Sequence, residues 1–148
     1  MADEKTFRLK IISPDRVFYE GDITMLELAT SEGEMGIYAE HMPLTAVLMP
    51  DTIKIHVNGE IKKAALHSGF VEILGDRVTV LAEVVEWPEE IDVNRANEAR
   101  IRAERRLASH DDNINVMRAE LALKRSLARL GACLLYTSPS PRDPKTSR

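Results

Sequence analysis

Arginines at helical spacing are the side chains in this sequence best suited to binding chemistry. We expect residues 88–130 to form two helices with a break at 109–113, because an advance of 100° per residue then gathers arginines into one row on each helix. The rows are Arg95, Arg102 and Arg106 on the first helix, and Arg118, Arg125 and Arg129 on the second. Guanidinium groups bind carboxylates and phosphates through paired hydrogen bonds. The spacing therefore predicts a helical hairpin that can present positive charge to an anionic ligand or surface.

Formal charge is unevenly distributed along the chain. Residues 1–90 hold 8 Lys/Arg and 17 Asp/Glu, whereas residues 91–148 hold 12 and 7, so an acidic part precedes a basic one. Parts of opposite charge usually have different partners. The acidic first part and the small number of aromatic residues (three Tyr, three Phe and one Trp) argue against nucleic-acid binding, although the basic hairpin keeps a nucleic-acid-binding protein as an alternative.

Other chemistry has little support in the sequence. The chain lacks the Gly-Lys-Ser/Thr of a P-loop, and Gly33 and Gly36, which are flanked by carboxylates, form no phosphate cradle. His41 has no carboxylate or cysteine at metal-ligand spacing, so its default interpretation is a structural or exposed histidine. We therefore predict no catalytic residue and no metal site, and a hydrolytic enzyme is the least supported class.

The acidic part has the pattern of short strands separated by turns. Apolar residues alternate or cluster at 7–11, 17–19, 23–29, 52–57, 61–67, 70–74 and 78–81. Asn58-Gly59 and Gly75-Asp76 predict hairpins, and Gly21-Asp22 predicts a turn. Strands that recur about every 8–12 residues, with one apolar face, indicate an antiparallel β-sandwich or flattened barrel.

Each predicted helix also has an apolar side. These sides consist of Val93, Ala96, Ala103 and Leu107 on the first helix, and Val116, Ala119, Leu123, Leu127 and Leu130 on the second. Packed along these sides, the helices form an antiparallel hairpin. The predicted fold class is therefore α+β, an N-terminal antiparallel β-sandwich followed by a C-terminal two-helix antiparallel hairpin.

Pro88 and Gly131 mark the predicted ends of the hairpin. Pro88 disfavours helical geometry at Trp87, which we expect to cover the sandwich edge where the helices begin. Gly131 is a natural helix terminator, and the proline-rich residues after it predict a non-native, disordered tail in which Cys133 has no role. The predicted parts are 1–87, 88–131 and 132–148.

Four segments in order and in one frame resemble the epsilon subunit of F-type ATP synthases. They are SEGEMGIYAEHMPL (31–44), ALHSGFVEILGDRVTVLAE (65–83), IDVNRANEARIRAERRL (91–107) and MRAELALKRSLARL (117–130). The resemblance covers roughly residues 6–130 and implies a non-catalytic rotor subunit that links the gamma subunit to the c ring. The N-terminus is acidic and no apolar run is long enough to span a bilayer, so we expect membrane contact only through partner subunits, at the cytoplasmic face of a bacterial membrane.

The resemblance also implies particular contact residues. Glu32 and Glu34 correspond to the turn that faces the c ring, and His41 lies in the loop that faces gamma. Residues 91–96 satisfy the I/L-D-x-x-R-A motif with which some bacterial epsilon subunits hold ATP. The ATP-binding residues implied are Glu86, Ile91, Asp92, Arg95, Ala96, Arg102, Arg125 and Arg129. ATP would be a regulatory ligand, and neither a required cofactor nor a protein-bound Mg²⁺ is expected.

The resemblance implies a switch with two positions of the hairpin. ATP would neutralise arginines that face inward between the folded helices, whereas an extended hairpin would lay them on the alpha/beta catalytic head and block ATP hydrolysis. Two alternatives remain open. Asp92 could serve only as a helix N-cap with the arginines as a solvated face, and the chain could be a free-standing ATP-sensing module.

Overall fold

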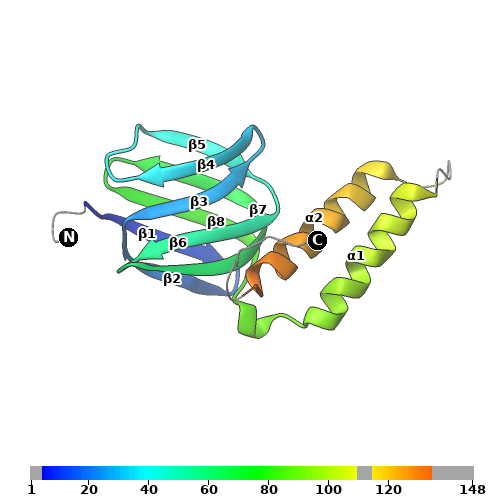
Figure 1. Ribbon diagram of the computed structural model, residues 1–148. Helices are drawn as coiled ribbons and strands as arrows, with labels where there is room; N and C mark the ends of the chain where they lie inside the picture. Colours follow the sequence, from blue (N-terminus) through cyan, green and yellow to red (C-terminus); the bar gives the residue numbers. More distant parts are fainter. Residues whose placement is uncertain (1–4, 110–114, 135–148) are drawn as a thin grey trace, which may run out of the picture.

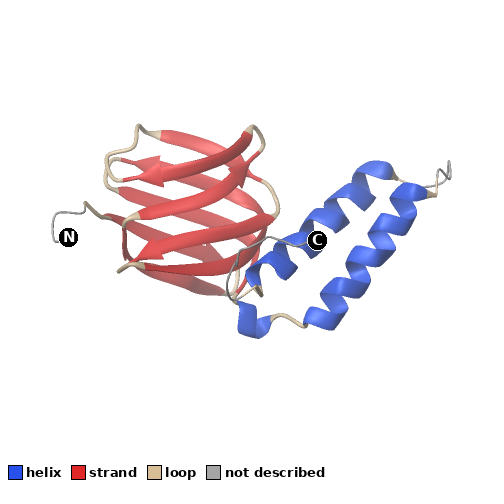
Figure 2. Cartoon of the chain, viewed as in Figure 1, coloured by secondary structure: helices blue, strands red, loops and turns tan. Residues whose placement is uncertain are grey.

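The computed structural model describes residues 5–109 and 115–134. Within them, eight strands form a β-sandwich and two helices form a hairpin beside it (Figures 1 and 2). The strands are β1 (Phe7–Ser13), β2 (Arg16–Ile23), β3 (Met25–Thr30), β4 (Gly33–Tyr38), β5 (Leu44–Leu48), β6 (Asp51–Val57), β7 (Glu60–Leu74) and β8 (Arg77–Glu86). A 3₁₀ turn, η1 (Pro88–Glu90), leads to α1 (Val93–Ala108) and α2 (Val116–Ala132). The predicted α+β architecture is confirmed.

Strand β7 pairs with three other strands of the sandwich, namely β5, β6 and β8. Its first half pairs with β6 and its second half with β5, while β8 pairs along most of its length. The register shifts at Ser68 and Gly69, where Gly69 has φ +157° and an added Cβ would lie 2.0 Å from the carbonyl oxygen of Leu81. Only glycine fits this bend. The strands predicted at 61–67 and 70–74 are therefore one bent strand.

Two of the three turns predicted from the sequence are confirmed, and the third is wrong. Asn58 and Gly59, both with positive φ, connect β6 to β7, and Gly75 with φ +59° begins the connection from β7 to β8. The turn expected at Gly21 is wrong, because Gly21 pairs with Leu9 inside β2. The strand β5 follows Pro43 in a segment where the sequence analysis predicted no strand. All the strand pairs are antiparallel except β1 with β8, which run parallel.

The junction between sandwich and hairpin is pinned by aromatic and ionic contacts. Trp87 stacks on Phe18 with ring centroids 4.1 Å apart and packs against the core, as expected from its place beside Pro88. Arg16 of β2 makes a two-contact ion pair with Glu90, at 2.7 and 2.8 Å. These contacts attach the chain to the sandwich as far as the end of η1.

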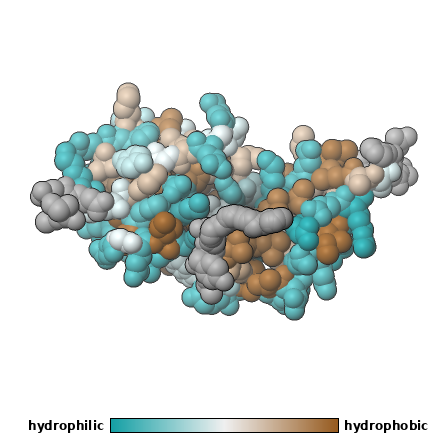
Figure 3. Space-filling view, viewed as in Figure 1, coloured by the Kyte–Doolittle hydropathy of each residue, from teal (hydrophilic) through white to brown (hydrophobic). Residues whose placement is uncertain are grey.

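Small side chains form the packing surface of the hairpin. α1 packs on α2, and α2 packs on β6 and β7, an arrangement that we call the docked hairpin (Figure 1). The buried residues are Ala96 and Ala103 of α1, and Ala119, Ser126, Ala128 and Ala132 of α2. The predicted apolar sides are wrong at Val93 of α1 and at Val116 and Leu127 of α2, which are 47%, 56% and 49% exposed. Figure 3 shows hydrophobic surface along the hairpin. Small residues allow the helix backbones to approach closely, which bulky side chains would prevent.

The second helix ends later than predicted. Gly131 lies inside α2, and Cys133 is its C-cap, with its backbone N–H bonded to the carbonyl oxygens of Arg129 and Leu130. The tail predicted at 132–148 is wrong at its start, because Ala132 is the last residue of α2 and Cys133 is its C-cap. The rest of that tail, from residue 135 onward, and most of the helix break predicted at 109–113 lie outside the described residues.

Candidate functional site

An ionic contact joins the sandwich to the hairpin. Glu86, the last residue of β8, accepts hydrogen bonds from Arg129 of α2, with Nε 2.8 Å from Oε1 and Nη2 3.3 Å from Oε2. His67 of β7 lies on the other side of the carboxylate, with Nε2 3.0 Å from the same Oε1. The sequence placed Glu86 and Arg129 in one ligand set, and the structure brings them together directly.

The environment of Glu86 favours its ionised form. Burial alone would raise the pKa of this carboxyl, but hydrogen bonds from Arg129 and His67 outweigh burial and hold the pKa below its ordinary value. Glu86 is therefore negative in the docked hairpin and meets the charge of Arg129. This pairing gives the sandwich and α2 a charge-assisted contact that belongs to the chain itself.

Three further predicted ATP-binding residues lie at or close to the start of α1. Asp92 is the N-cap of α1, since its Oδ1 accepts a hydrogen bond from the backbone N–H of Arg95 at 3.1 Å. Ile91 packs on the small cluster of Ala65, Ala128 and Ala132. Ala96 is buried in the hairpin. The N-cap role of Asp92 is confirmed, and it leaves the second carboxylate oxygen available to another donor.

The expectation that four arginines face inward is wrong. Arg95, Arg102 and Arg125 are exposed, and Arg129 is half-buried. In the part of the chain that the structure describes, no hydrogen bond or ion pair is recorded for the side chains of the three exposed arginines, whereas Arg100 pairs with Glu104 at 2.8 Å. Water screens charges in such positions, so mutual repulsion does not by itself force the hairpin open.

The predicted subunit-contact residues lie at opposite ends of β4. Glu32 is in the β3–β4 turn, where its backbone N–H bonds to Thr30 Oγ1, and Glu34 follows at the start of β4. His41 lies beyond the other end of β4, with Nδ1 2.9 Å from the carbonyl oxygen of Met42. The structure therefore separates the glutamates from His41, which suits two different partners.

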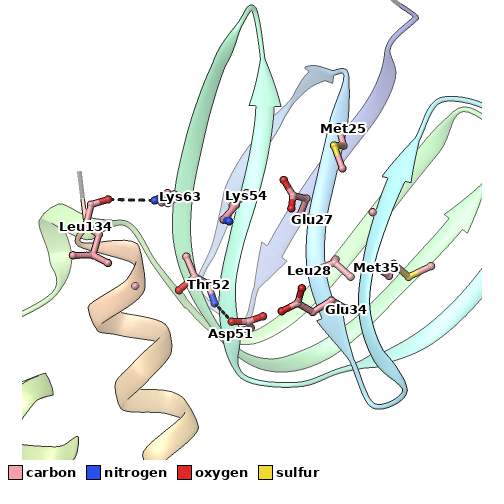
Figure 4. A pocket seen from close by; sticks show the side chains of 12 residues that line it. Met25, Glu27, Leu28, Glu34, Met35, Asp51, Thr52, Lys54, Lys63 and Leu134 are labelled. Carbon is pink, nitrogen blue, oxygen red and sulfur yellow. Dashed lines mark hydrogen bonds between the residues drawn. The ribbon is translucent and has the colours of Figure 1, made fainter. Parts of the chain in front are cut away.

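Two hollows lie beside Glu34. One, of about 390 Å³, lies on the outer face of β3, β4, β6 and β7, and Figure 4 shows side chains of both charges around it, among them Glu27, Lys54 and Lys63. The other, of about 430 Å³, separates the β3–β4 turn from Lys124 and Leu127 of α2. The β3–β4 turn and helix α2 of the docked hairpin thus line the same hollow.

A row of exposed apolar side chains crosses the other face of the sandwich. Val47, Phe70 and Leu81 are opposite one another on β5, β7 and β8. They are 48%, 53% and 51% exposed, and they border a hollow of about 630 Å³. We call these three residues the apolar row. An exposed apolar cluster of this kind is typical of a protein-binding surface.

Sequence reasoning missed His67 and Thr52. Alternation within 61–67 puts His67 on the same face as Ala65, opposite the core residues Ala64 and Leu66, but gives no sign that a helix covers that face. Thr52 Oγ1 donates a hydrogen bond to the carbonyl oxygen of Ala128 at 2.9 Å. Neither contact could be found without knowing where α2 docks.

Residues 5–109 and 115–134 contain no group of three or more His, Cys, Asp or Glu side chains placed to hold a metal ion. In the same ranges, neither helix has the length and apolar character needed to cross a bilayer.

Two family models match the chain in succession. The first, described as the ATP synthase Delta/Epsilon chain beta-sandwich domain, matches residues 6–88. The second, described as the ATP synthase Delta/Epsilon chain long alpha-helix domain, matches residues 89–133. Together they cover the sandwich and the hairpin.

Individual proteins agree with these matches. The ATP synthase epsilon chain of Caldanaerobacter subterraneus subsp. tengcongensis is 42% identical over 134 residues, which are 90% of this chain and 97% of that protein. The ATP synthase epsilon chain of Clostridium novyi is 43% identical over 127 residues, 85% of this chain and 96% of that protein. A chain in the solved structure of the Euglena gracilis mitochondrial ATP synthase (OSCP/F1/c-ring) superposes with a TM-score of 0.70 at 22% identity, over 80% of this chain and 76% of that one. At that identity the likeness shows the fold alone.

Proposed function

The chain belongs to the ATP synthase epsilon chain family, whose members are non-catalytic subunits. From this we propose that it works in the central stalk of a proton-translocating F-type ATP synthase. There it would link the gamma subunit to the c ring, at the cytoplasmic face of a bacterial cell membrane, and restrain ATP hydrolysis through its hairpin. One observation carries the proposal: sandwich and hairpin both match the family in a single frame over residues 6–133.

The sandwich supplies the proposed binding surfaces. The apolar row of Val47, Phe70 and Leu81 supports a contact with gamma, because half-exposed apolar side chains in a continuous row gain from being covered. Glu32 and Glu34 at the β3–β4 turn are proposed to meet polar loops of the c ring. Membrane association would then come through these partners.

The hairpin supplies the proposed regulation. An ATP triphosphate would be attracted by Arg95, Arg102 and Arg125, which are exposed and lie on α1 and α2. Arg129, already paired with Glu86, would complete the site from the sandwich side. Binding would favour the docked hairpin, and undocking would release the arginines to an acidic surface of the alpha/beta head.

The stalk assignment is tested with purified subunits. The chain should co-purify with gamma and should lower the ATPase activity of a catalytic head prepared without it. Failure of both would overturn the stalk role and leave the ATP-sensing module as the better interpretation.

The nucleotide response is tested separately. ATP titration, with and without Mg²⁺, should increase the protection of hairpin amides against hydrogen exchange in the parent chain. Arg95→Ala and Arg125→Ala should abolish the response, and Arg105→Ala, an exposed arginine outside the two rows, should preserve it. Equal ATP binding by all four proteins would show that the arginines are only a solvated face.

A further inference from the structure

His67 lies where α2 covers the sheet. Along β7, Ala64 and Leu66 point into the core, whereas Ala65 packs with Ala128 and Ala132 of α2. His67 is the next residue on the outer face and is only 4% exposed. An outer-face side chain is buried here because the docked helix lies over it, so undocking would return the imidazole to water.

Only one of the two imidazole nitrogens of His67, Nε2, has a hydrogen-bond partner among the described residues. In the neutral tautomer that donates from Nε2, His67 bonds to Glu86 Oε1, the same oxygen that accepts from Arg129. The buried Nδ1 has no hydrogen-bond partner among the described residues. A second proton would have to sit on Nδ1, facing neither an acceptor nor solvent, and a buried unsatisfied donor of this kind is costly.

The charges around His67 act in both directions, and the net effect with burial is to lower its pKa. Glu86 from β8 and Arg125 and Arg129 from α2 are the charged groups that face it. Burial lowers the pKa of His67, the hydrogen bond with Glu86 opposes this, and Arg129 and Arg125 add repulsion toward a positive imidazole. The net effect holds the pKa below its ordinary value of 6.5.

We propose that His67, Glu86 and Arg129 form a proton-controlled latch, in which neutral His67 permits the hairpin to dock and protonation of His67 releases it. The latch acts without nucleotide and so goes beyond the regulation by ATP proposed above. His67 is a positioning residue here, since it acts on the hairpin through Glu86.

The sign of the pH effect follows from the two states. Undocked His67 titrates near its ordinary pKa, and docked His67 titrates lower, so docking is complete above about pH 6.5 and weakens as the pH falls toward the docked pKa. One linked proton changes the docking equilibrium by up to about tenfold per pH unit in that window. Glu86 loses its charge in a different pH range, below its ordinary pKa of 4.5, and this effect is separate from the titration of His67.

The test is hydrogen exchange of α2 amides in the full chain without nucleotide, between pH 8 and pH 5, corrected for the intrinsic pH dependence of exchange. Protection should fall by up to about tenfold per pH unit below 6.5 in the parent chain. In His67→Gln, which keeps a donor but cannot titrate, this slope should vanish. His56→Gln is the matched control, because His56 also pairs with a glutamate, Glu27 at 2.5 Å, but on β6 and β3; its slope should equal that of the parent.

Two results would overturn the latch: a flat profile in the parent chain, or an unchanged slope in His67→Gln. If His67→Gln fails to dock at every pH, the imidazole titration of the parent decides by NMR. A His67 pKa below 6.5 in the docked chain supports the latch, and a value at or above 6.5 rejects it. A pH response that survives while ATP has no effect would reject the nucleotide site and leave the latch standing.

Discussion

A Cβ atom on Gly131 would lie 2.3 Å from Oγ1 of Thr52, the same hydroxyl that donates to the carbonyl oxygen of Ala128. Helix α2 therefore approaches β6 at Gly131, a position that has no side chain. Gly131 lies inside α2 and permits close packing on β6, so it does not end the helix. Docking depends on the absence of a Cβ atom at this residue. Close packing at Gly131 thus adds to the ion pair of Arg129 and Glu86 in holding the hairpin on the sandwich.

Gly131→Ala should undock the hairpin and leave the sandwich folded. Alanine favours helix over glycine by about 1 kcal/mol, so α2 itself is not weakened and a loss of docking must come from the clash with Thr52. Hydrogen exchange should show loss of α2 protection, with strands β6 and β7 unchanged. Adding Thr52→Ala should restore part of the docking, because the nearest remaining atom, Cβ, lies 3.4 Å away. Full docking of the single variant would contradict this packing.

Arg129→Ala should weaken docking by about 1.5–3 kcal/mol, the usual size of a hydrogen bond to a charged group, since Glu86 then keeps only His67 as a partner. Arg129→Lys should recover part of this loss, because an ammonium cannot reproduce the two contacts of the guanidinium. Hydrogen exchange of α2 at pH 7.5 measures both. Arg102→Ala, exposed on α1, should change docking by less than about 0.5 kcal/mol. Equal losses at Arg102 and Arg129 would show that net charge matters, not this pair.

Local sequence signals were sufficient for the outline of the fold. Asn58-Gly59 needs positive φ at both residues, so it predicts a hairpin from two residues alone, and Asp92 caps α1 with an oxygen three residues from its donor. Helix and strand periodicities likewise separate the two parts of the chain. Each of these signals is complete within a few neighbouring residues.

Contacts between distant segments could not be predicted in this way. The sequence predicted separate strands at 61–67 and 70–74, but the structure has one strand that bends at Gly69, where Leu81 of β8 approaches closely. A helical wheel favoured Leu127 for burial, yet alanines and Ser126 bring the backbones closer and leave the leucine half-exposed. His67 became part of the candidate site only because α2 docks over it. Tertiary packing decided each of these cases.

Gly69→Ala should destabilise the whole sandwich by about 3 kcal/mol or more, because its Cβ would meet the carbonyl oxygen of Leu81 at 2.0 Å and neither backbone can move freely. Gly59→Ala is the matched control. It also has positive φ, but its Cβ would meet nothing within 4 Å, so it should cost only about 1–2 kcal/mol. Urea unfolding measures both free energies. Equal costs would indicate that backbone strain alone, not the clash, makes glycine necessary at residue 69.

Glu86→Gln should weaken docking at neutral pH by about 1.5–3 kcal/mol and remove the part of the acid dependence of docking that lies below pH 4.5. The pKa of Glu86 is held below 4.5 in the docked hairpin, so the docking free energy that it contributes is fully present above pH 4.5 and is lost as the pH falls through the docked pKa. Hydrogen exchange of α2 between pH 4.5 and pH 3 measures this loss in the parent chain. Glu89→Gln, an exposed glutamate in η1, should keep the parent profile. An acid response that persists in Glu86→Gln would assign it to another carboxylate.

Phe70→Ser should separate partner binding from folding. Phe70 occupies the centre of the apolar row between Val47 and Leu81, and its ring is half-exposed, so truncation should lower sandwich stability by no more than about 1 kcal/mol. A central aromatic residue of an interface commonly contributes 2 kcal/mol or more, so affinity for the gamma subunit should fall at least about tenfold. Ile61→Ser is the matched control, since Ile61 is also 53% exposed on β7 but lies beside the turn to β6, away from the row. Calorimetric titration of gamma into each folded variant gives the two affinities. If Ile61→Ser weakens binding as much as Phe70→Ser, or if neither does, gamma must bind another face of the sandwich.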